Sequence, residues 1–299
     1  MSKNVLSFEE WEVESDAPFG SGASSKRLLV DSKTHQKGIF KFPKQHVDGS
    51  YTNEYIAEKL AYELAGKLNI PCAKVDLGIF EGKIGSMSYI MLDPIKEDLV
   101  HGVDYIFKKH PNYNGDKFSD VITGETYSVQ MILDCTNELN VVNDLFKIII
   151  FDCLIGNSDR HHCNWGIIVN KRTYDVRVSP MYDNGSSLAC YVKLQDVENY
   201  FQDSNRMQSL IYSKSRSRIG WKEIKKPRHF ELLQYIKDEY YTETIEIVKI
   251  IKENLKDEAI NQMIDEYSDE IIHPQFKKLI KFFLKERVKR ILEIYNIEQ

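Results

Sequence analysis

Apolar residues recur at helical spacing in the segment 52–70, TNEYIAEKLAYELAGKLNI. Residues four positions apart lie on one face of a helix, so the pattern predicts an amphipathic helix here. Thr52 or Asn53 can cap its start, and Pro71 ends it. The residues of the predicted apolar face are Ile56, Leu60, Leu64 and Leu68.

Short β-favouring runs surround this helix, separated by Gly, Asp, Lys and Pro. They are KRLLVDS, KGIFKFPK, KVDLGIF and GSMSYIML. Residues 101–127 are polar and rich in Asn, Gly and Asp, which indicates a hinge or insertion. From residue 128 the pattern turns helical, apart from a β-like pair, WGIIVN and DVRVSPMYD. We therefore predict an α+β fold with a β-rich N-lobe (1–100), a hinge or insertion (101–127) and a large helical C-lobe (128–299).

Composition is that of a soluble globular protein, with 42% hydrophobic and 28% charged residues. The net charge of -5 argues against direct specific DNA binding and against binding to anionic membranes. The longest apolar run, near 145–156, contains Lys147 and Asp152 and is too short to span a bilayer. The N-terminus has no apolar core of signal-peptide length, and five scattered cysteines fit reduced thiols. These features predict a cytoplasmic protein without a membrane partner.

A dense polar cluster, IGNSDRHHCNWGI, follows the apolar run LFKIIIFDCLIGN. Asp159 and Asn164 lie five residues apart, and Asp183 follows about twenty residues further on, in SPMYDNGSS. Each residue alone is more typical of a turn or cap. Together they suit phosphoryl transfer from ATP, in which the first Asp orients or deprotonates the acceptor hydroxyl and the other two residues hold Mg²⁺.

The N-terminal half supplies complementary parts. Lys41, on a predicted strand, can reach the ATP phosphates, and Glu54 on the next helix can pair with it, with Glu58 as the alternate. Each signal alone is weak, but the order along the chain is that of kinases. The Gly/Ser-rich turn before the strand can fold over phosphates with its backbone N–H groups; it comprises Gly20, Ser21, Gly22, Ala23, Ser24 and Ser25.

The chain resembles the HipA-type serine/threonine kinases of bacteria, in particular their compact toxin members. NEYIAEKLAYELAGKLNIP is similar to a helix of the family, IGNSDRHHCNWGI matches its catalytic loop, and VSPMYDNGSS resembles its metal-binding segment. The order Asp-Arg-His distinguishes it from the His-Arg-Asp of ordinary protein kinases. The resemblance covers residues 20 to about 190 and implies a bilobal, protein-kinase-like fold.

The resemblance also implies roles for individual residues. Lys41 would contact the ATP phosphates, Asp159 would be the catalytic base, and Asn164 and Asp183 would ligate Mg²⁺. His161 would brace the loop. Family members autophosphorylate serines of the Gly-rich loop, which points to Ser21, Ser24 or Ser25 here; a toxin role with an antitoxin partner is a further implication.

Several alternatives remain at this point. A small-molecule or lipid kinase, or a regulatory nucleotide-binding pseudokinase, fits the same scaffold. The spacing of the residues in RHHC disfavours a zinc site. Cys163 is interpreted as a small packing residue and not as a nucleophile. Segment 206–228 holds eight Lys or Arg and one acid, Glu223. It reads either as a solvated surface or as a site that attracts an acidic peptide, a phosphorylated loop or an RNA-associated substrate protein.

Overall fold

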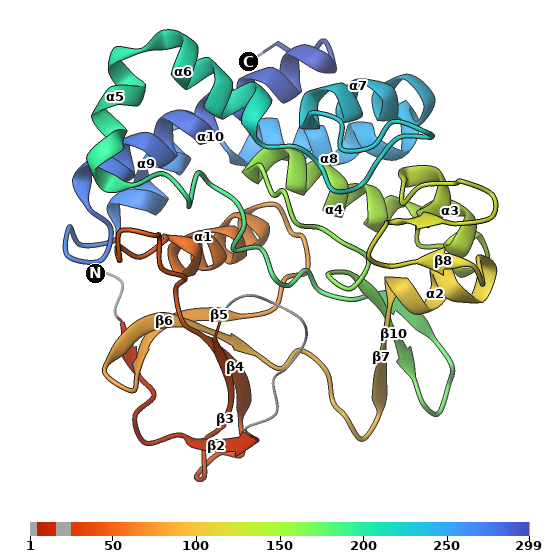
Figure 1. Cartoon of the computed structure of the whole chain (residues 1–299), viewed down its shortest axis with the longest axis horizontal. Coiled ribbons are helices and arrows are strands. Elements are labelled where there is room, and N and C mark those ends of the chain that lie inside the picture. The colour runs from red at the N-terminus through yellow and green to blue at the C-terminus, as the bar shows by residue number, and fades with distance from the viewer. Residues whose placement is uncertain (1–4, 16–24, 299) are drawn as a thin grey trace.

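A twisted sheet of six strands forms the β-rich lobe of the computed structural model, which describes residues 5–15 and 25–298 (Figure 1). The strand order is β1-β5-β6-β4-β3-β2, and only the β1–β5 pair is parallel among these neighbours. The predicted α+β fold with two lobes is confirmed. The strands are β1 (Leu6–Ser7), β2 (Glu12–Ser15), β3 (Lys26–Val30), β4 (Lys37–Lys41), β5 (Val75–Phe80) and β6 (Lys83–Tyr89).

Helix α1 (Glu54–Lys67) lies between this sheet and the helical lobe (Figure 1). Its apolar face is buried as the four-residue spacing predicts, and it belongs to the core of the helical lobe. The same helix contacts β5 and β6. Asn53 is the N-cap residue, but its side chain makes no capping hydrogen bond. Because α1 touches both lobes, its side chains can reach a site between them.

The polar segment 101–127 contains more regular structure than its composition indicates. It holds α2 (Gly102–Lys109), whose Ile106 is fully buried, and the short pair β8 (Tyr113–Asn114) and β9 (Ser119–Asp120). The preceding strand β7 (Glu97–His101) pairs with β10 (Gly166–Asn170), which pairs with β11 (Val176–Val178). This three-stranded sheet carries the polar cluster of the sequence at the start of β10.

The apolar run before that cluster forms α4 (Val142–Ile155), which is buried along most of its length. It contacts α7, α8 and α10, so it occupies the centre of the helical lobe. No helix in the described part of the chain is both long and apolar enough to cross a membrane. The other helical elements are α3 (Val129–Thr136), η1 (Asn137–Leu139), η2 (Leu194–Asp196), α5 (Val197–Gln202), α6 (Ser204–Ser209), η3 (Leu210–Lys214), α7 (His229–Glu239), α8 (Tyr241–Asn254), α9 (Asp257–Asp265) and α10 (Pro274–Ile294).

Candidate active site

Lys41, the last residue of β4, lies between two carboxylates. Its Nζ is 2.8 Å from Asp183 Oδ1 and 3.4 Å from Glu58 Oε2. Burial on its own would lower the pKa of Lys41, but the charges of Glu58 and Asp183 outweigh burial and raise it above its usual value. The ammonium group is therefore charged at every physiological pH. The contact between Lys41 and Asp183 joins residues that are 142 positions apart in the chain.

The partner of Lys41 on helix α1 is not Glu54, the preferred prediction. Glu58, the alternate, makes this contact, and its side chain is only 3% exposed. Glu54 instead accepts hydrogen bonds from Lys44 Nζ, Thr52 Oγ1 and Tyr191 OH, each at 2.9 Å. The two glutamates lie one helical turn apart, so the sequence alone could not separate them.

Asp183 is placed by backbone contacts on both sides. Met181 N donates to Pro71 O, and Ala73 N donates to Met181 O, both at 2.8 Å. Asp183 has a left-handed φ of 57°, and the next N–H, that of Asn184, donates to Glu58 Oε1 at 2.9 Å. The charge of Lys41 lowers the pKa of Asp183 well below its usual range, so the carboxylate is ionised.

The loop after α4 carries the other two oxygen donors. The Asp159 side chain is 42% exposed, so a substrate hydroxyl can reach it. Asn164 Nδ2 donates to the Asp159 carbonyl at 2.8 Å, which leaves Asn164 Oδ1 as the atom available to a cation. A carboxylate and an amide oxygen are the hard donors that Mg²⁺ prefers, so Asn164 and Asp183 fit this metal.

Arg160 holds this loop against the Asp183 segment, a role that the sequence did not reveal. It is 1% exposed, and its guanidinium makes a bidentate pair with Asp152 on α4, at 2.8 and 2.9 Å. Its Nη1 donates to the carbonyls of both Asn164 (2.8 Å) and Tyr182 (2.7 Å). Because one nitrogen bonds both carbonyls, the two metal-ligand candidates lie on adjacent backbone segments. An acid inside an apolar run, Asp152, was the only available signal.

The base of the loop is fixed from the helical lobe. Gly156 ends α4 with φ 69°, and a Cβ there would lie 2.9 Å from the Phe283 ring. Arg287 of α10 donates to the carbonyls of Cys153 and Leu154 in the last turn of α4. His229 Nε2 bonds the Asn157 carbonyl at 2.8 Å. The loop that carries Asp159 and Asn164 therefore begins from a rigid anchor.

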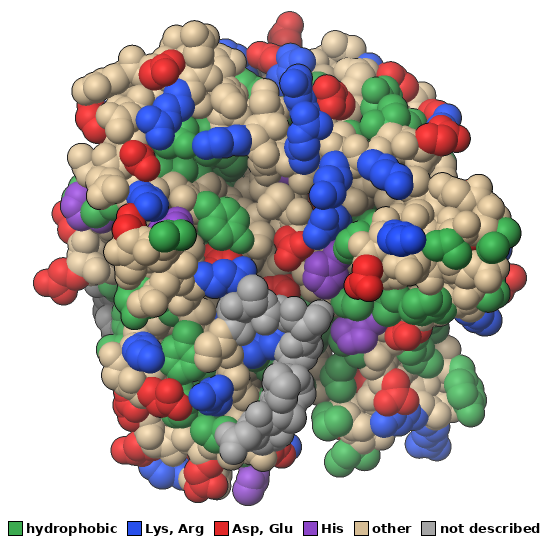
Figure 2. Space-filling view, in the orientation of Figure 1, with side chains coloured by type: hydrophobic (Ala, Val, Ile, Leu, Met, Phe, Trp, Pro, Cys, Tyr) green, Lys and Arg blue, Asp and Glu red, His purple; other side chains and the backbone are tan. Residues whose placement is uncertain are grey.

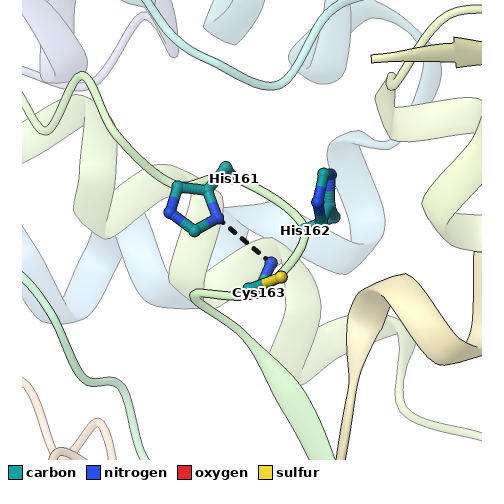
Figure 3. Close-up of side chains that lie close together, drawn as sticks. All are labelled: His161, His162 and Cys163. Atoms are coloured by element: carbon teal, nitrogen blue, oxygen red, sulfur yellow. Dashed lines mark hydrogen bonds between the residues drawn. The ribbon is translucent and has the colours of Figure 1, made fainter. Parts of the chain in front are cut away.

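Three side chains that could hold a metal lie together in this loop: His161, His162 and Cys163 (Figure 3). His161 Nδ1 accepts a hydrogen bond from Cys163 N at 3.2 Å, as expected for a residue that braces the loop. His162 Nδ1 bonds Tyr113 OH at 3.0 Å, and burial lowers the pKa of His162 to about 4. Burial raises the pKa of the Cys163 thiol, which disfavours the thiolate that zinc requires. The donor set therefore fits zinc poorly.

The predicted phosphate-binding loop falls mostly on Gly20, Ser21, Gly22, Ala23 and Ser24, which lie outside the described residues. Ser25 is exposed at the start of β3. Lys26, which follows it, is a cation that the sequence reasoning missed. Burial lowers the pKa of Lys26, the charge of Asp183 raises it, and Lys41 lowers it further. The charge of Lys26 is therefore influenced by the same carboxylate that pairs with Lys41.

Comparison with known proteins identifies the family of this chain. The family model for HipA-like C-terminal domains matches residues 20–271. The serine/threonine-protein kinase CtkA of Helicobacter pylori is 20% identical over 304 residues, which cover 97% of this chain and 87% of CtkA. The match extends through the helical tail, beyond the region of resemblance recognised in the sequence.

Two solved structures share the fold. The crystal structure of the H. pylori proinflammatory kinase CtkA superposes with a TM-score of 0.80 at 18% identity, covering 97% of this chain and 96% of CtkA. HipA of Shewanella oneidensis MR-1, solved in complex with HipB and its operator DNA, has a TM-score of 0.59 at 14% identity. That superposition covers 97% of this chain and 67% of HipA. The family predicted from the sequence motifs is confirmed: the chain belongs to the HipA-like C-terminal domain family.

Proposed function

We propose that this protein is an ATP- and Mg²⁺-dependent serine/threonine protein kinase of the HipA type. One observation supports the proposal most strongly. Lys41, Glu58 and Asp183 converge from β4, α1 and the segment after β11. The loop with Asp159 and Asn164 is bound to the same segment through Arg160. This enzyme class agrees with the name of the relative CtkA.

Each residue has a defined task in this proposal. Lys41 would bind nucleotide phosphate oxygens, and Glu58 would hold its ammonium in place. Asn164 and Asp183 would hold Mg²⁺, which neutralises charge on the phosphates when bound. Asp159 would orient the acceptor hydroxyl and accept its proton. Catalysis would come from positioning and from charge neutralisation.

Three finer points belong to the same proposal. Ser21, Ser24 or Ser25 would be the site of autophosphorylation, and a phosphate there would add negative charge where ATP phosphates bind. A toxin role is proposed as well, with an antitoxin partner as in the HipA–HipB complex of the structural neighbour. Growth arrest on expression, relieved by Asp159→Ala, tests the toxin role.

Two alternatives use the same scaffold. A small-molecule or lipid kinase would share the nucleotide site but have a different acceptor. A regulatory pseudokinase would bind nucleotide without transfer, and the presence of Lys41, Asp159, Asn164 and Asp183 together argues against it.

Mass spectrometry after incubation with Mg·ATP separates these functions. Addition of phosphate to Ser21, Ser24 or Ser25 in the wild type, and none in Asp159→Asn, is the expected result. An unmodified wild-type protein that consumes ATP only with a small-molecule or lipid acceptor would contradict the protein-kinase proposal.

A further inference from the structure

A basic segment that begins at Lys214, the last residue of η3, leads to Asp159. Exposure alternates along it: Lys214 and Arg216 are exposed and Arg218 is half-buried, whereas Ser217 and Ile219 are buried. Lys214, Arg216 and Arg218 are thus the exposed or half-buried cations of this segment, and together they are called the basic row.

Backbone pairing fixes the middle of this segment. Arg216 forms an antiparallel bridge with Arg228, and Ser217 N donates to the Pro227 carbonyl at 3.0 Å. Ser217 Oγ accepts from Ile219 N at 3.1 Å. The cations of the basic row therefore project from a fixed backbone, which reduces the entropy lost when a ligand binds.

Arg218 is the member of the row nearest to the proposed catalytic base. Its Nη2 is 3.8 Å from Asp159 Oδ1, and its guanidinium lies over the Phe118 ring, 4.5 Å from the centroid. Its Nε is buried and has no hydrogen-bond partner among the described residues. A guanidinium that is oriented but incompletely hydrogen-bonded gains from an incoming anion.

The other two cations of the row are not neutralised by carboxylates within the described part of the chain. Lys214 Nζ donates to Tyr200 OH, and Arg216 Nη1 donates to the Lys226 carbonyl. By contrast, Lys222 outside the row is paired with Glu239 at 2.7 Å. Figure 2 shows Lys and Arg side chains in a column that descends the helical lobe toward the cleft between the lobes, where Asp or Glu and His side chains gather.

We propose that the basic row binds acidic side chains of the acceptor polypeptide, so that the kinase prefers serines or threonines with acidic neighbours. The inference rests on the proposed function and names its substrate class. Arg218 Nη2 lies 3.8 Å from Asp159 Oδ1, so the acceptor hydroxyl would lie at Asp159 when an acidic side chain of the same peptide meets Arg218.

RNA is less well matched to this surface. Proteins that bind single-stranded RNA stack bases on exposed aromatic rings. Aromatic rings lie at both ends of the row. Phe118 is covered by Arg218 and packs against His162, 5.0 Å between ring centroids, and Tyr200, beside Lys214, is buried. Among the described residues, the rings that the row contacts therefore offer no free stacking surface, which favours acidic side chains.

Fluorescence anisotropy and steady-state kinetics with three labelled peptides test the inference. The peptides share one central serine flanked by glutamates, glutamines or lysines. The wild type is expected to bind the glutamate peptide about tenfold more tightly than the glutamine peptide, through one or two charge-assisted contacts. Arg216→Gln and Arg218→Gln should each reduce this ratio toward one. Lys225→Gln removes the same charge from an exposed position outside the row and should leave the ratio unchanged.

The outcomes separate this inference from the proposed function. The inference is overturned if the wild type binds all three peptides with equal affinity, or if Lys225→Gln reduces the affinity ratio as much as Arg216→Gln and Arg218→Gln do. Phosphate transfer to the serine of any of the peptides would still support the proposed kinase activity. Selective binding of the glutamate peptide without transfer would uphold the inference and contradict the kinase. Tighter binding of an RNA oligonucleotide of equal charge, lost in the same two variants, would replace the acidic acceptor with RNA.

Discussion

A buried lysine between two carboxylates determines the electrostatics of the cleft. Lys41 is 18% exposed and Glu58 3%, so their interaction is poorly screened by solvent. Without nucleotide, Asp183 shares the ammonium with Glu58. If Asp183 binds a cation, as proposed, Glu58 would remain to hold Lys41 in place. In that proposal Glu58 is a positioning residue, and Lys41 is the group that would contact phosphate.

Glu58→Gln is expected to lower kcat/KM for phosphate transfer by about 10- to 100-fold, as is typical when a group that orients a ligand is removed. The amide keeps the shape but loses the charge that holds Lys41. Glu54→Gln is the matched control on the same helix, because Glu54 contacts Lys44 and not Lys41. Steady-state kinetics with Mg·ATP provide the measurement, and equal losses in both variants would contradict the assignment.

Substitutions of Asp159 and Asp183 should affect nucleotide binding and phosphate transfer differently. Asp183→Asn is expected to weaken Mg²⁺-dependent binding of a non-hydrolysable nucleotide, because it removes a charged metal ligand. Asp159→Asn should leave that binding intact while lowering kcat by about 10²- to 10⁴-fold, through loss of the acceptor base. Calorimetric titration and initial rates on the same preparations distinguish the two effects. The reverse pattern would mean that the roles are exchanged.

Helices α4, α7 and α10 meet where the catalytic loop begins. Arg160 and Asp152 connect the loop to α4, and His229 at the start of α7 bonds the Asn157 carbonyl. Asn157 Oδ1 in turn accepts from Asp159 N at 3.1 Å. The position of the proposed base is therefore set by elements that never touch substrate.

Arg160→Met is expected to lower the free energy of unfolding by about 3–5 kcal/mol, because it leaves Asp152 buried without its partner. The double variant Asp152→Asn/Arg160→Met should recover part of that loss, since no buried charge remains. Urea denaturation measures both. Arg172→Met, at an exposed position, is the control; a loss as small for Arg160→Met as for this control would show that the buried pair contributes little.

His229 should make stability depend on pH. Burial lowers the pKa of His229 from 6.5 to about 3. Below pH 6.5 the unfolded chain takes up the proton first, so the free energy of unfolding should fall by about 1.4 kcal/mol per pH unit until the folded protein is also protonated. His229→Gln removes this contribution. Urea unfolding between pH 7 and pH 5 should show a shallower decline in the variant, and identical slopes would contradict the assignment.

At the scale of the whole molecule, α1 lies between the β-rich lobe and the helical lobe (Figure 1), and charged side chains from β4, α1 and the segment after β11 meet at Lys41. Helical periodicity predicted the buried face of α1, and the interval from Asp159 to Asn164 led to the proposed site. These signals are local, because periodicity and motif spacing are properties of a short stretch of chain.

Other features of the cleft could not be read from the sequence because they depend on pairs distant along the chain. The choice of Glu58 over Glu54 depends on how α1 is rotated toward Lys41. Helix α2 was missed because the polar composition of its surroundings masked one buried residue, Ile106. The position of the basic row, with Arg218 at its end, depends on backbone contacts of Arg216 with Arg228 and of Ser217 with Pro227. No pattern in the sequence indicates these contacts.

Transfer of radiolabelled γ-phosphate from ATP tests the central claim most directly. Wild-type protein with Mg²⁺ should label itself or an added acidic serine peptide, and chelation of the metal should stop the labelling. Asp159→Asn and Asp183→Asn should each remain unlabelled while retaining the wild-type circular dichroism spectrum. Undiminished labelling in either variant, or labelling that continues after chelation, would contradict the account.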